Sequence, residues 1–409
     1  WFLSTARSPS LALSYRTFCW SSSTRASEWK GKPDMTTTVQ AIALRKGRLR
    51  RPEVATQWQL MWWKYKKHHM ALVGMTMLAV LVFSAVFAEF LSPVVPSERN
   101  NKYLASGPMG IHFFDAEWNF HPRPFVYART TKRDPVTLRK LSVIDETKFW
   151  PIQFFVRGSA YKFWGLIDTD IHLIAAEGGF VHLFGTDNLG RDVFTRTLHA
   201  TRVSLSVGLV GVAFAFILGA IIGGIAGYFG GMIDNLIMRL IEFIRSVPTL
   251  PLWLALSATL PREWTSFQVY LAITFILALI GWTHLARTVR SKLLALREED
   301  FTLAARLSGC TDMRIILRHL LPSFMSYMIV DVTIAFPEIL LAETSLSFLG
   351  LGLRDPVESW GVLLYAAQNV RSIAHMPWLL IPGLFVVLAV LAFNFVGDGM
   401  RDAADPYSK

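Results

Sequence analysis

Residues 203–228 contain no charged side chain, and most of them are apolar. About 20 apolar residues in a helix cross the ~30 Å hydrocarbon core of a bilayer, so this segment is predicted to span a membrane. Charged residues make up only 17% of the chain, against roughly 25% in an ordinary soluble domain. The sequence therefore predicts an all-α integral membrane protein with six transmembrane helices, at residues 70–91, 203–228, 233–260, 269–286, 323–346 and 378–396.

Basic residues gather beside two of these segments. Eight Lys and Arg lie between Arg45 and Lys67, and seven more lie in residues 287–321. Because Lys and Arg are enriched in cytoplasmic segments, we expect a basic cytoplasmic tail at 35–69, a cytoplasmic loop at 287–322, and both termini in the cytoplasm. Membrane topology then explains the formal net charge of +11, and nucleic acid is not expected as a partner.

Residues 1–34 differ in character from the rest of the chain. They begin at Trp1 and are rich in Ser and Arg but poor in acidic residues, a composition that resembles an organellar transit peptide. We interpret them instead as a non-native or upstream extension, with Met35 as the natural start. The two cysteines, Cys19 and Cys310, predict neither a disulfide framework nor a metal site.

Residues 92–202 are not predicted to cross the membrane. Aromatic and polar residues alternate there, with frequent Pro and Gly, which indicates short strands and turns. Since one span separates these residues from the cytoplasmic tail, they are predicted to form a small extracytoplasmic domain, α+β or β-rich, between the first and second helices.

Three glycines stand four positions apart in the second predicted helix, at Gly219, Gly223 and Gly227. Residues with this spacing share one helix face and allow a second helix to approach closely. That second helix belongs either to another subunit or to this chain.

The third and fifth predicted helices carry charged residues, which are rare within membrane spans and suggest function there. Arg239 and Glu242 can pair at i,i+3 spacing, either inside the membrane or on a helix that extends beyond it. Asp331, Glu338 and Glu343 are candidates for a translocation pathway, together with that pair. The alternatives are structural pairing of these carboxylates with Arg239 or Arg245, or a place for Asp331 near the cytoplasmic edge.

Motifs of several common enzyme classes are absent from the sequence. It contains no G-x-x-x-x-G-K-S/T phosphate loop, no H-E-x-x-H and no G-x-S-x-G, which removes the common nucleotide-binding, zinc-protease and serine-hydrolase interpretations. We therefore predict no catalytic residue and no enzymatic activity, and any energy for transport has to come from another protein.

The predicted cytoplasmic loop contains a pattern typical of two short helices joined by a turn. Ala304-Ala305 lie in the first helix, Gly309 can end it in a left-handed conformation, and the second stops at Leu321-Pro322. This pattern resembles the EAA loop by which ABC-importer permeases dock on their ATPase subunits. One departure is Leu303, which stands where the motif has Glu, so Glu299 or Asp300 would have to supply that polar contact.

Two further stretches strengthen the resemblance. Residues 184–194 (FGTDNLGRDVF) precede the second span, residues 343–353 close the fifth, and Ser359-Trp360-Gly361 follow it. With the loop, they resemble the second permease subunit of bacterial oligopeptide and dipeptide ABC importers. The motif and gate residues are Gly185, Thr186, Asp187, Gly190, Arg191, Asp192, Gly350, Gly352, Trp360 and Gly361.

Residues 187–190 are predicted to form a tight turn. Asp187 can accept hydrogen bonds from backbone donors, and Gly190 is free to take a positive φ. The acid and amide spacing partly matches a calcium-binding loop, but the closing glutamate of such a loop is missing. No metal is expected.

The resemblance implies a permease subunit of a binding-protein-dependent peptide importer in the bacterial inner membrane. Its partners would be a homologous six-helix permease, two ABC ATPases that bind ATP and Mg, an extracytoplasmic solute-binding protein and a peptide. The chain itself would hold no cofactor. The residues implied to transmit force are Leu303, Ala304, Ala305, Gly309, Ile316, Leu321 and Pro322.

Two other functions remain open from the residues alone. A passive channel or an ion-coupled transporter would use the intramembrane carboxylates as a proton or cation relay. A membrane scaffold would bind partners without moving a substrate. Neither needs the Ala-Ala…Gly…Leu-Pro loop, which favours the importer.

Overall fold

The computed structural model describes residues 57–404, apart from 134–139, 177–178 and 262. The extension at 1–34, Cys19 and most of the predicted basic tail therefore lie outside the described residues. Within the described part, five helices are long and apolar enough to cross a membrane, or six if one bent pair counts as a span. The five are α3 (His69–Val86), α5 (Val193–Phe229), α8 (Ser266–Leu296), α12 (Met325–Phe348) and α15 (Ile381–Ala404), the last preceded by the 3₁₀ turn η3 (Pro377–Leu380).

The third predicted span is not one continuous helix. It consists of α6 (Gly231–Ser246) and α7 (Thr249–Ala258), which meet at an angle of 83°. Val247 has extended backbone angles, φ −88° and ψ 131°, because a residue before proline is disfavoured in the helical region. Pro248 therefore breaks the helix that the sequence predicted over residues 233–260.

Two helices run further than their apolar segments. α5 begins at Val193, ten residues before the predicted start at 203, where Asp192 caps it by accepting a hydrogen bond from the backbone N–H of Thr195 at 2.7 Å. α8 continues to Leu296, past the predicted end at 286. Charged residues keep a segment out of the bilayer core, but they do not end a helix. The position at which a helix begins or ends depends on its capping residues.

The glycine face of α5 packs against α8 of the same chain. A Cβ atom on Gly223 would lie 2.4 Å from the carbonyl oxygen of Ala286, and one on Gly227 would lie 2.7 Å from that of Arg290. A Cβ on Gly219 would be 2.9 Å from the Cβ of Leu285. Of the two alternatives for this face, the structure shows packing within the chain.

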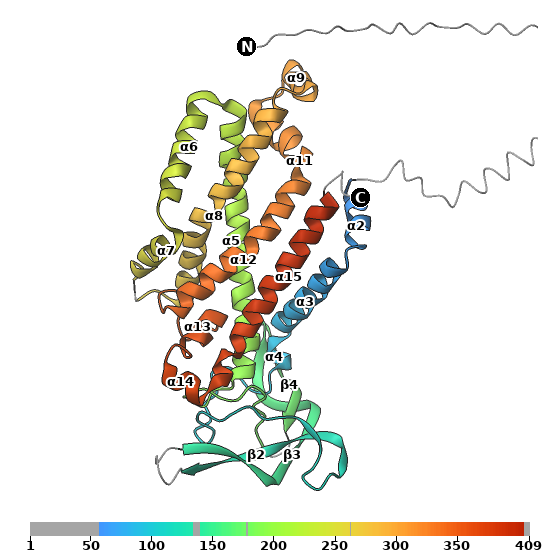
Figure 1. Cartoon of the computed structure of the whole chain (residues 1–409), viewed down its shortest axis with the longest axis vertical. Helices are drawn as coiled ribbons and strands as arrows, with labels where there is room; N and C mark the ends of the chain where they lie inside the picture. Colours follow the sequence, from blue (N-terminus) through green and yellow to red (C-terminus); the bar gives the residue numbers. More distant parts are fainter. Residues whose placement is uncertain (1–56, 134–139, 177–178, 262, 405–409) are drawn as a thin grey trace, which may run out of the picture. The chain divides into compact units, whose positions relative to one another are not determined.

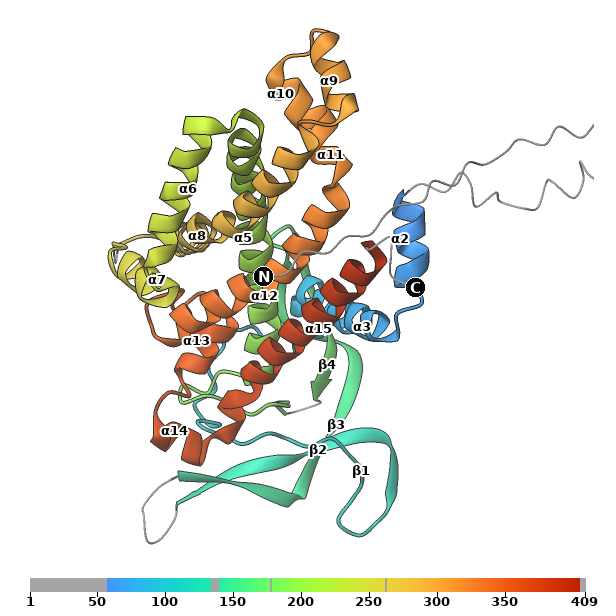
Figure 2. The ribbon, with the colours of Figure 1, turned by 45° about the horizontal axis from the view of Figure 1, so that its top comes forward.

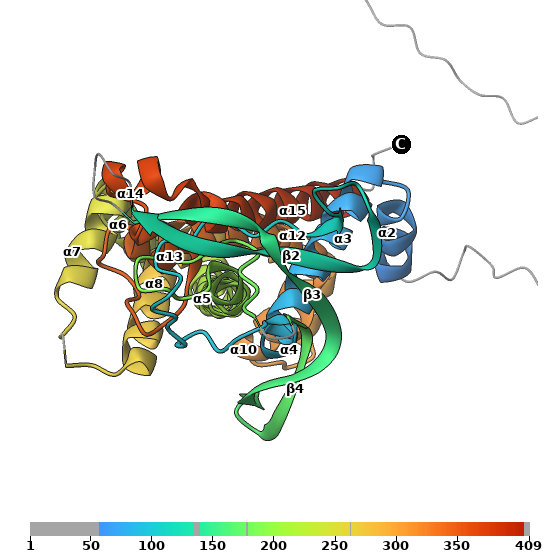
Figure 3. The ribbon, with the colours of Figure 1, turned by 90° about the horizontal axis from the view of Figure 1, so that it is seen from below.

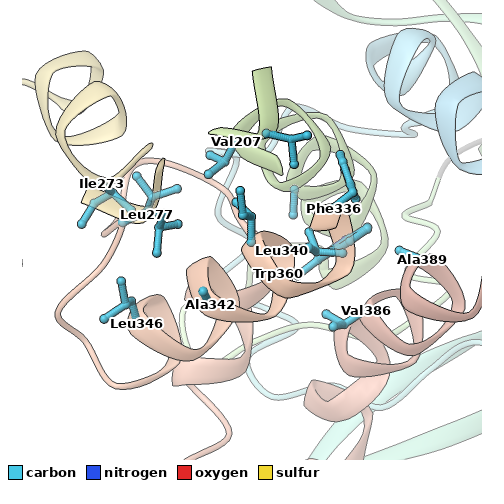
Figure 4. Close-up of a cluster of buried hydrophobic side chains, with 14 of the residues drawn as sticks. Val207, Ile273, Leu277, Phe336, Leu340, Ala342, Leu346, Trp360, Val386 and Ala389 are labelled. Carbon is cyan, nitrogen blue, oxygen red and sulfur yellow. The ribbon is translucent and has the colours of Figure 1, made fainter. Parts of the chain in front are cut away.

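The main hydrophobic core joins all five long helices, with α3 contributing Leu81, and Figure 4 shows part of it. Val207 of α5, Ile273 of α8, Leu340 of α12 and Ala389 of α15 are all buried in it. The rings of Phe336 and Phe393 stack at 3.7 Å between α12 and α15. Trp360, on the short helix α13 (Trp360–Tyr365), is also fully buried in this core.

Residues between α4 (Ala88–Leu91) and α5 form an antiparallel sheet with strand order β1-β2-β3-β4. The strands are β1 (His112–Phe114), β2 (Phe120–Arg133), β3 (Lys140–Phe163) and β4 (Ile167–Ala176). Three of them are longer than the short strands predicted. The sheet lies at the end of the long helices opposite α9 (Figures 1 and 2).

At the other end of the helices, α8 leads into a compact helical element. It contains α9 (Asp300–Leu307), α10 (Asp312–Arg314), a π-helical turn (Ile315–Leu320) and α11 (Leu321–Ser323). The second of the two predicted helices does not stop at Pro322, because this residue occupies the first turn of α11, where a missing backbone N–H is tolerated. Two short helices, α2 (Gln57–Tyr65) and α14 (Val370–His375), complete the described helices.

Candidate functional site

The turn between α9 and α10 has the geometry that the sequence predicted. Gly309 has a φ of +76°, a conformation that favours glycine at the end of a helix. Its N–H donates to the carbonyl of Arg306 at 3.0 Å, and the N–H of Cys310 donates to that of Ala305 at 3.2 Å. These bonds reverse the chain tightly, so that α9 and α10 form one unit.

Tyr228, at the end of α5, forms hydrogen bonds to both α9 and α10. Its hydroxyl donates to the Oδ1 atom of Asp312 at 2.6 Å and accepts from the Nε atom of Arg306 at 3.2 Å. The Arg306 guanidinium also lies 5.0 Å from the centre of the Tyr228 ring, within the range of a cation–π interaction. Thr302 donates to the carbonyl of Leu296 at 2.8 Å, which fastens α9 to α8.

The residues predicted to transmit force divide into two groups. Ile316 and Leu321 are buried in a cluster with residues of α5, α8 and α12, so they attach the element to the helices. The others reach the surface: Leu303, Ala304, Gly309 and Pro322 are exposed, and Ala305 is half-buried.

Two apolar residues on α9 were missed from the sequence. Leu307 is 90% exposed and Phe301 is 42% exposed. Leu303 and Leu307 are four positions apart and therefore share a face of the helix. That spacing could have been used for prediction, because two leucines on one face of a short helix that follows charged residues indicate a contact surface.

The second site lies at the other end of the long helices, in the predicted turn at residues 187–190. Oδ1 of Asp187 accepts from the backbone N–H groups of Leu189 at 2.8 Å and Arg191 at 2.9 Å, as the sequence predicted. Its Oδ2 atom accepts from the side chains of Arg191 and Arg196, each at 2.8 Å. Gly190 has a φ of +73°, which confirms the predicted positive value.

The neighbouring motif residues fix this turn to the chain before and after it. The N–H of Ser106 donates to Oγ1 of Thr186 at 2.9 Å, and Nδ1 of His182 lies 3.0 Å from Oδ1 of Asp192. Gly185 has a φ of +76°, and a Cβ there would be 2.6 Å from the carbonyl oxygen of Ser106. Glycine is therefore required at Gly185 by both conformation and space.

Charged side chains connect this turn to the loop that follows α12. Arg191 donates to Asp355 at 2.5 Å, and Arg196 donates to Glu358. Burial acts to raise the pKa of Asp355, but the hydrogen bond and positive charge of Arg191 outweigh it and lower that pKa. Burial raises the pKa of Glu358, with partial compensation by Arg196. The sequence did not identify Arg196, Asp355 or Glu358; the only signal was that all three lie within or beside its motif stretches.

Glu343 anchors the same loop from inside the helices. It is completely buried; its Oε1 accepts from Ser347 Oγ at 2.8 Å, and its Oε2 lies 3.4 Å from Ser204 Oγ. The N–H of Trp360 donates to Ser204 at 3.1 Å. Hydroxyl groups, rather than the arginines considered from the sequence, are its hydrogen-bond partners.

Three glycines, two in the loop after α12 and Gly361 in α13, make a close approach possible. A Cβ on Gly361 would lie 2.6 Å from the carbonyl oxygen of Thr344, and one on Gly352 would lie 2.5 Å from the backbone nitrogen of Ser347. Gly350 has a φ of +76°. Together they let the loop return against α12 as it leaves the helix.

The remaining charged residues predicted for the pathway lie either at a cavity between helices or on the exposed surface of α6. Asp331 lies 3.3 Å from Nε2 of His284 on α8, and both line a cavity with Glu338 and Arg245. The predicted Arg239–Glu242 pair does form, at 2.9 Å, but both side chains are largely exposed on α6. Asp331 is therefore paired with a histidine, which the sequence interpretation had not considered.

Comparison with known proteins places the chain among transport permeases. Residues 215–408 match the family model described as binding-protein-dependent transport system inner membrane component. Residues 56–108 match the N-terminal transmembrane domain of oligopeptide transport permease C.

Among relatives, the dipeptide transport system permease protein DppC of Bacillus subtilis is 41% identical over 227 residues, which cover 55% of this chain and 68% of the relative. The oligopeptide transport system permease protein OppC of Haemophilus influenzae is 40% identical over 244 residues, covering 58% and 75%. A chain from an inward-facing structure of the MetNI methionine ABC transporter aligns with 22% identity and a TM-score of 0.39, covering 51% of this chain and 96% of that one.

Proposed function

Because the chain belongs to the family of binding-protein-dependent inner-membrane transport permeases, in its dipeptide and oligopeptide branch, we propose that it forms half of the translocation pathway of an ATP-driven peptide importer. The observation that carries the proposal is the two-sided element at residues 300–323. One side is built into the core through Ile316 and Leu321, and the other presents Leu303 and Leu307 on its surface.

The exposed side of this element is the docking surface for an ATPase subunit. Exposed leucines and small residues on one face fit a groove in a partner protein. Docking there places the element in the cytoplasm, and with it the basic loop that contains it. Two ATPases would supply ATP hydrolysis with Mg, and a homologous permease would complete the pathway.

Force passes from the ATPase to the helices through Tyr228. This residue links α9 and α10 to α5, so a movement of the docked element tilts α5 and the helix packed on its glycine face. We envisage alternating access, in which ATP binding closes the ATPases and opens the pathway to the outside. No residue of this chain takes part in the hydrolysis.

The network at the opposite end of α5 forms a platform for a solute-binding protein outside the membrane. Asp187, Arg191 and Arg196 connect the turn before α5 to the loop after α12. A partner that presses on either segment therefore acts on both, and on α5 through its first turn. The sheet between α4 and α5 would lie on the same, extracytoplasmic side.

The peptide passes beside the cavity lined by Arg245, His284, Asp331 and Glu338. A free peptide carries an ammonium group and a carboxylate, and this cavity offers side chains of both signs. Polar and ionisable residues within membrane spans generally face such a pathway.

Purification from native membranes in a mild detergent, with mass spectrometry of the recovered proteins, tests this function. We expect two ATPases with phosphate-loop motifs and a second six-span permease to accompany the chain. Leu307→Glu should release the ATPases, because a charge would replace the most exposed leucine of the docking surface. Leu303→Glu is the matched control, since it adds the same charge on the same face where the family motif carries Glu, and it should keep them bound.

Recovery of the chain alone or as a homo-oligomer would contradict the importer. It would favour a passive or ion-coupled transporter that relies on Asp331 and Glu338. Equal release of the ATPases by both leucine variants would contradict only the docking surface.

A further inference from the structure

The turn between β3 and β4 exposes an unusual amount of apolar surface. Leu166 is 86% exposed, Ile167 is 61% exposed and Trp164 is 51% exposed. Exposed apolar residues that are contiguous mark a contact with another protein or with lipid. We call Phe163–Ile167 the hairpin tip.

The tip is attached to the end of a membrane-crossing helix. The indole N–H of Trp164 donates to the carbonyl of Val86 at 3.0 Å, and Val86 is the last residue of α3. The Arg202 guanidinium lies 4.3 Å from the Trp164 ring and forms an ion pair with Glu89 at 2.6 Å. These contacts fix the height of the tip at the level where α3 leaves the hydrocarbon.

Aromatic side chains extend the apolar surface of α3 onto the hairpin without interruption. Phe83 of α3 is 54% exposed, and its ring lies 4.7 Å from that of Phe87. Phe87 in turn lies 6.1 Å from Phe163 in a stacked arrangement. The surface that α3 presents to lipid therefore continues onto the tip.

Charged pairs limit how far this surface extends along the hairpin. Lys162 and Asp168 face each other across the two strands at 3.7 Å, and Arg157 lies 3.9 Å from Asp170 further along. Trp is enriched at the boundary between a membrane and water, and Lys serves as an anchor at the same level. Seen from below in Figure 3, the hairpin extends outward beyond α4, away from the other helices.

We propose that the hairpin tip inserts into the headgroup region of the bilayer beside α3 and anchors the sheet at a fixed height above the membrane. The ion pairs at Lys162 and Arg157 keep the insertion shallow, because they remain in water. The proposal concerns lipid contact alone and does not depend on what the chain transports.

The turn between β1 and β2 provides an internal contrast. Trp118 is 83% exposed there, almost as much as Leu166. However, it lies beside Asp115 and Glu117, and the Asp115 carboxylate accepts hydrogen bonds from the backbone of Asn119 and Glu117 at 2.8 and 3.0 Å. The turn also exposes Phe114 and Phe120, so the carboxylates around the indole, and not a lack of apolar surface, are the reason that we expect it to stay in water.

Site-specific fluorescence quenching of the full chain in lipid vesicles tests the proposal. Cys19→Ser and Cys310→Ser remove the two native thiols, and Leu166→Cys or Trp118→Cys then carries a bimane label. The vesicles contain phosphatidylethanolamine and phosphatidylglycerol, with a nitroxide lipid labelled near the headgroup as one quencher and aqueous iodide as the other. Gel filtration of each labelled variant verifies that it is folded.

We expect the nitroxide lipid to quench the label at position 166 severalfold more than the label at 118, and iodide to show the reverse order. Equal iodide quenching at both positions would place the tip in water and overturn the proposal. Protection of position 166 from both quenchers would also overturn it, because the tip would then be covered by protein.

Discussion

Arg196 and Glu358 are 162 positions apart in the chain, and the Nε atom of Arg196 lies 2.9 Å from both carboxylate oxygens of Glu358. Arg196 is in the first turns of α5, and Glu358 immediately precedes the buried α13. Their side chains are only 4% and 12% exposed. This pair therefore joins the first turns of α5 to the start of α13, in an environment where an unpaired charge is costly.

Removal of one partner should destabilise the protein. In Glu358→Ala the Arg196 guanidinium keeps its bond to Asp187 but leaves its Nε donor buried without a partner, a change that typically costs about 1–3 kcal/mol. The measurement is thermal unfolding of the purified protein in detergent. Glu242→Ala is the control, because its pair with Arg239 is exposed and should contribute at most about 1 kcal/mol. Equal destabilisation by the two variants would contradict a structural role for the buried pair.

The α5–α8 contact should not tolerate one added methyl group at its centre. A Cβ on Gly223 would lie 2.4 Å from a backbone oxygen, so Gly223→Ala forces the helices apart and should cost about 1–3 kcal/mol. At Gly383, also within a helix, the nearest atom would be 3.5 Å away. Gly383→Ala should therefore be neutral or stabilising by up to about 1 kcal/mol. Unfolding midpoints of both variants in the same detergent check this, and an unchanged midpoint for Gly223→Ala would refute it.

Loss of the Tyr228 hydroxyl should uncouple ATP hydrolysis from transport. Tyr228→Phe removes the bonds to Asp312 and Arg306 at a cost of about 1 kcal/mol, which leaves the ATPase docked but more loosely connected to α5. We expect more ATP hydrolysed per peptide transported in proteoliposomes. Tyr270→Phe is the control, since it removes a 3.1 Å bond to Ser206 within the helices. The same ratio in both variants and the wild type would argue against this connection.

Glu338 and Glu343 should respond differently to loss of charge. Glu338 lines the cavity with Asp331, so Glu338→Gln should lower uptake of cationic peptides relative to neutral ones by about fivefold, the equivalent of about 1 kcal/mol of charge interaction. Glu343 is buried against serines, so Glu343→Gln should change both uptake rates by the same factor. Competition between labelled peptides of the two kinds measures the ratio, and an unchanged ratio for Glu338→Gln would remove it from the pathway.

The link between Arg191 and Asp355 should withstand mild acid. The pKa of Asp355 is lowered from 3.8, so its contribution to stability is fully present above that value and is lost only as the pH falls through the lower, folded-state pKa. Between pH 7 and pH 5 we expect no weakening from this residue. Asp355→Asn should lose less stability than the wild type when the pH falls below about 4, as measured by thermal unfolding. A difference that already appears at pH 6 would contradict the lowered pKa.

Local features were predictable from the sequence, whereas the contacts between distant segments were not. The turn at Asp187 and Gly190 follows from the preferences of four consecutive residues, and the structure has it. The break at Pro248 was also visible in the sequence, but the apolar character of residues 247–260 suggested one span. Pro248 alone was enough to predict a break in the helix at this position, but the sequence interpretation did not use it.

The side-chain contacts of the candidate sites were harder to predict than the local turns, because they depend on which segments meet in space. The sequence places Glu343 within a span but cannot tell which face of the helix it occupies, so a place in the pathway and structural pairing with an arginine were both open, and burial among hydroxyl groups was not considered. The pairing of Arg196 with Glu358 depends on two loops meeting in space, and no spacing rule connects residues so far apart. The face shared by Leu303 and Leu307, in contrast, is set by helix geometry alone and could have been found.

The unbroken length of α5 has a mechanical consequence. Its 37 residues span about 55 Å at 1.5 Å per residue, which is longer than the hydrocarbon layer is thick. The ion pairs of Arg196 attach one end of α5 to neighbouring segments, and the hydrogen bonds of Tyr228 attach the other. Both ends of this rigid helix are therefore connected to parts of the chain that lie outside the hydrocarbon. A tilt of about 10° around its middle would displace each end by about 5 Å in opposite directions. A sideways movement of one end of α5 would thus produce an opposite movement of the other end, on the far side of the membrane, without any change in the secondary structure of the helix.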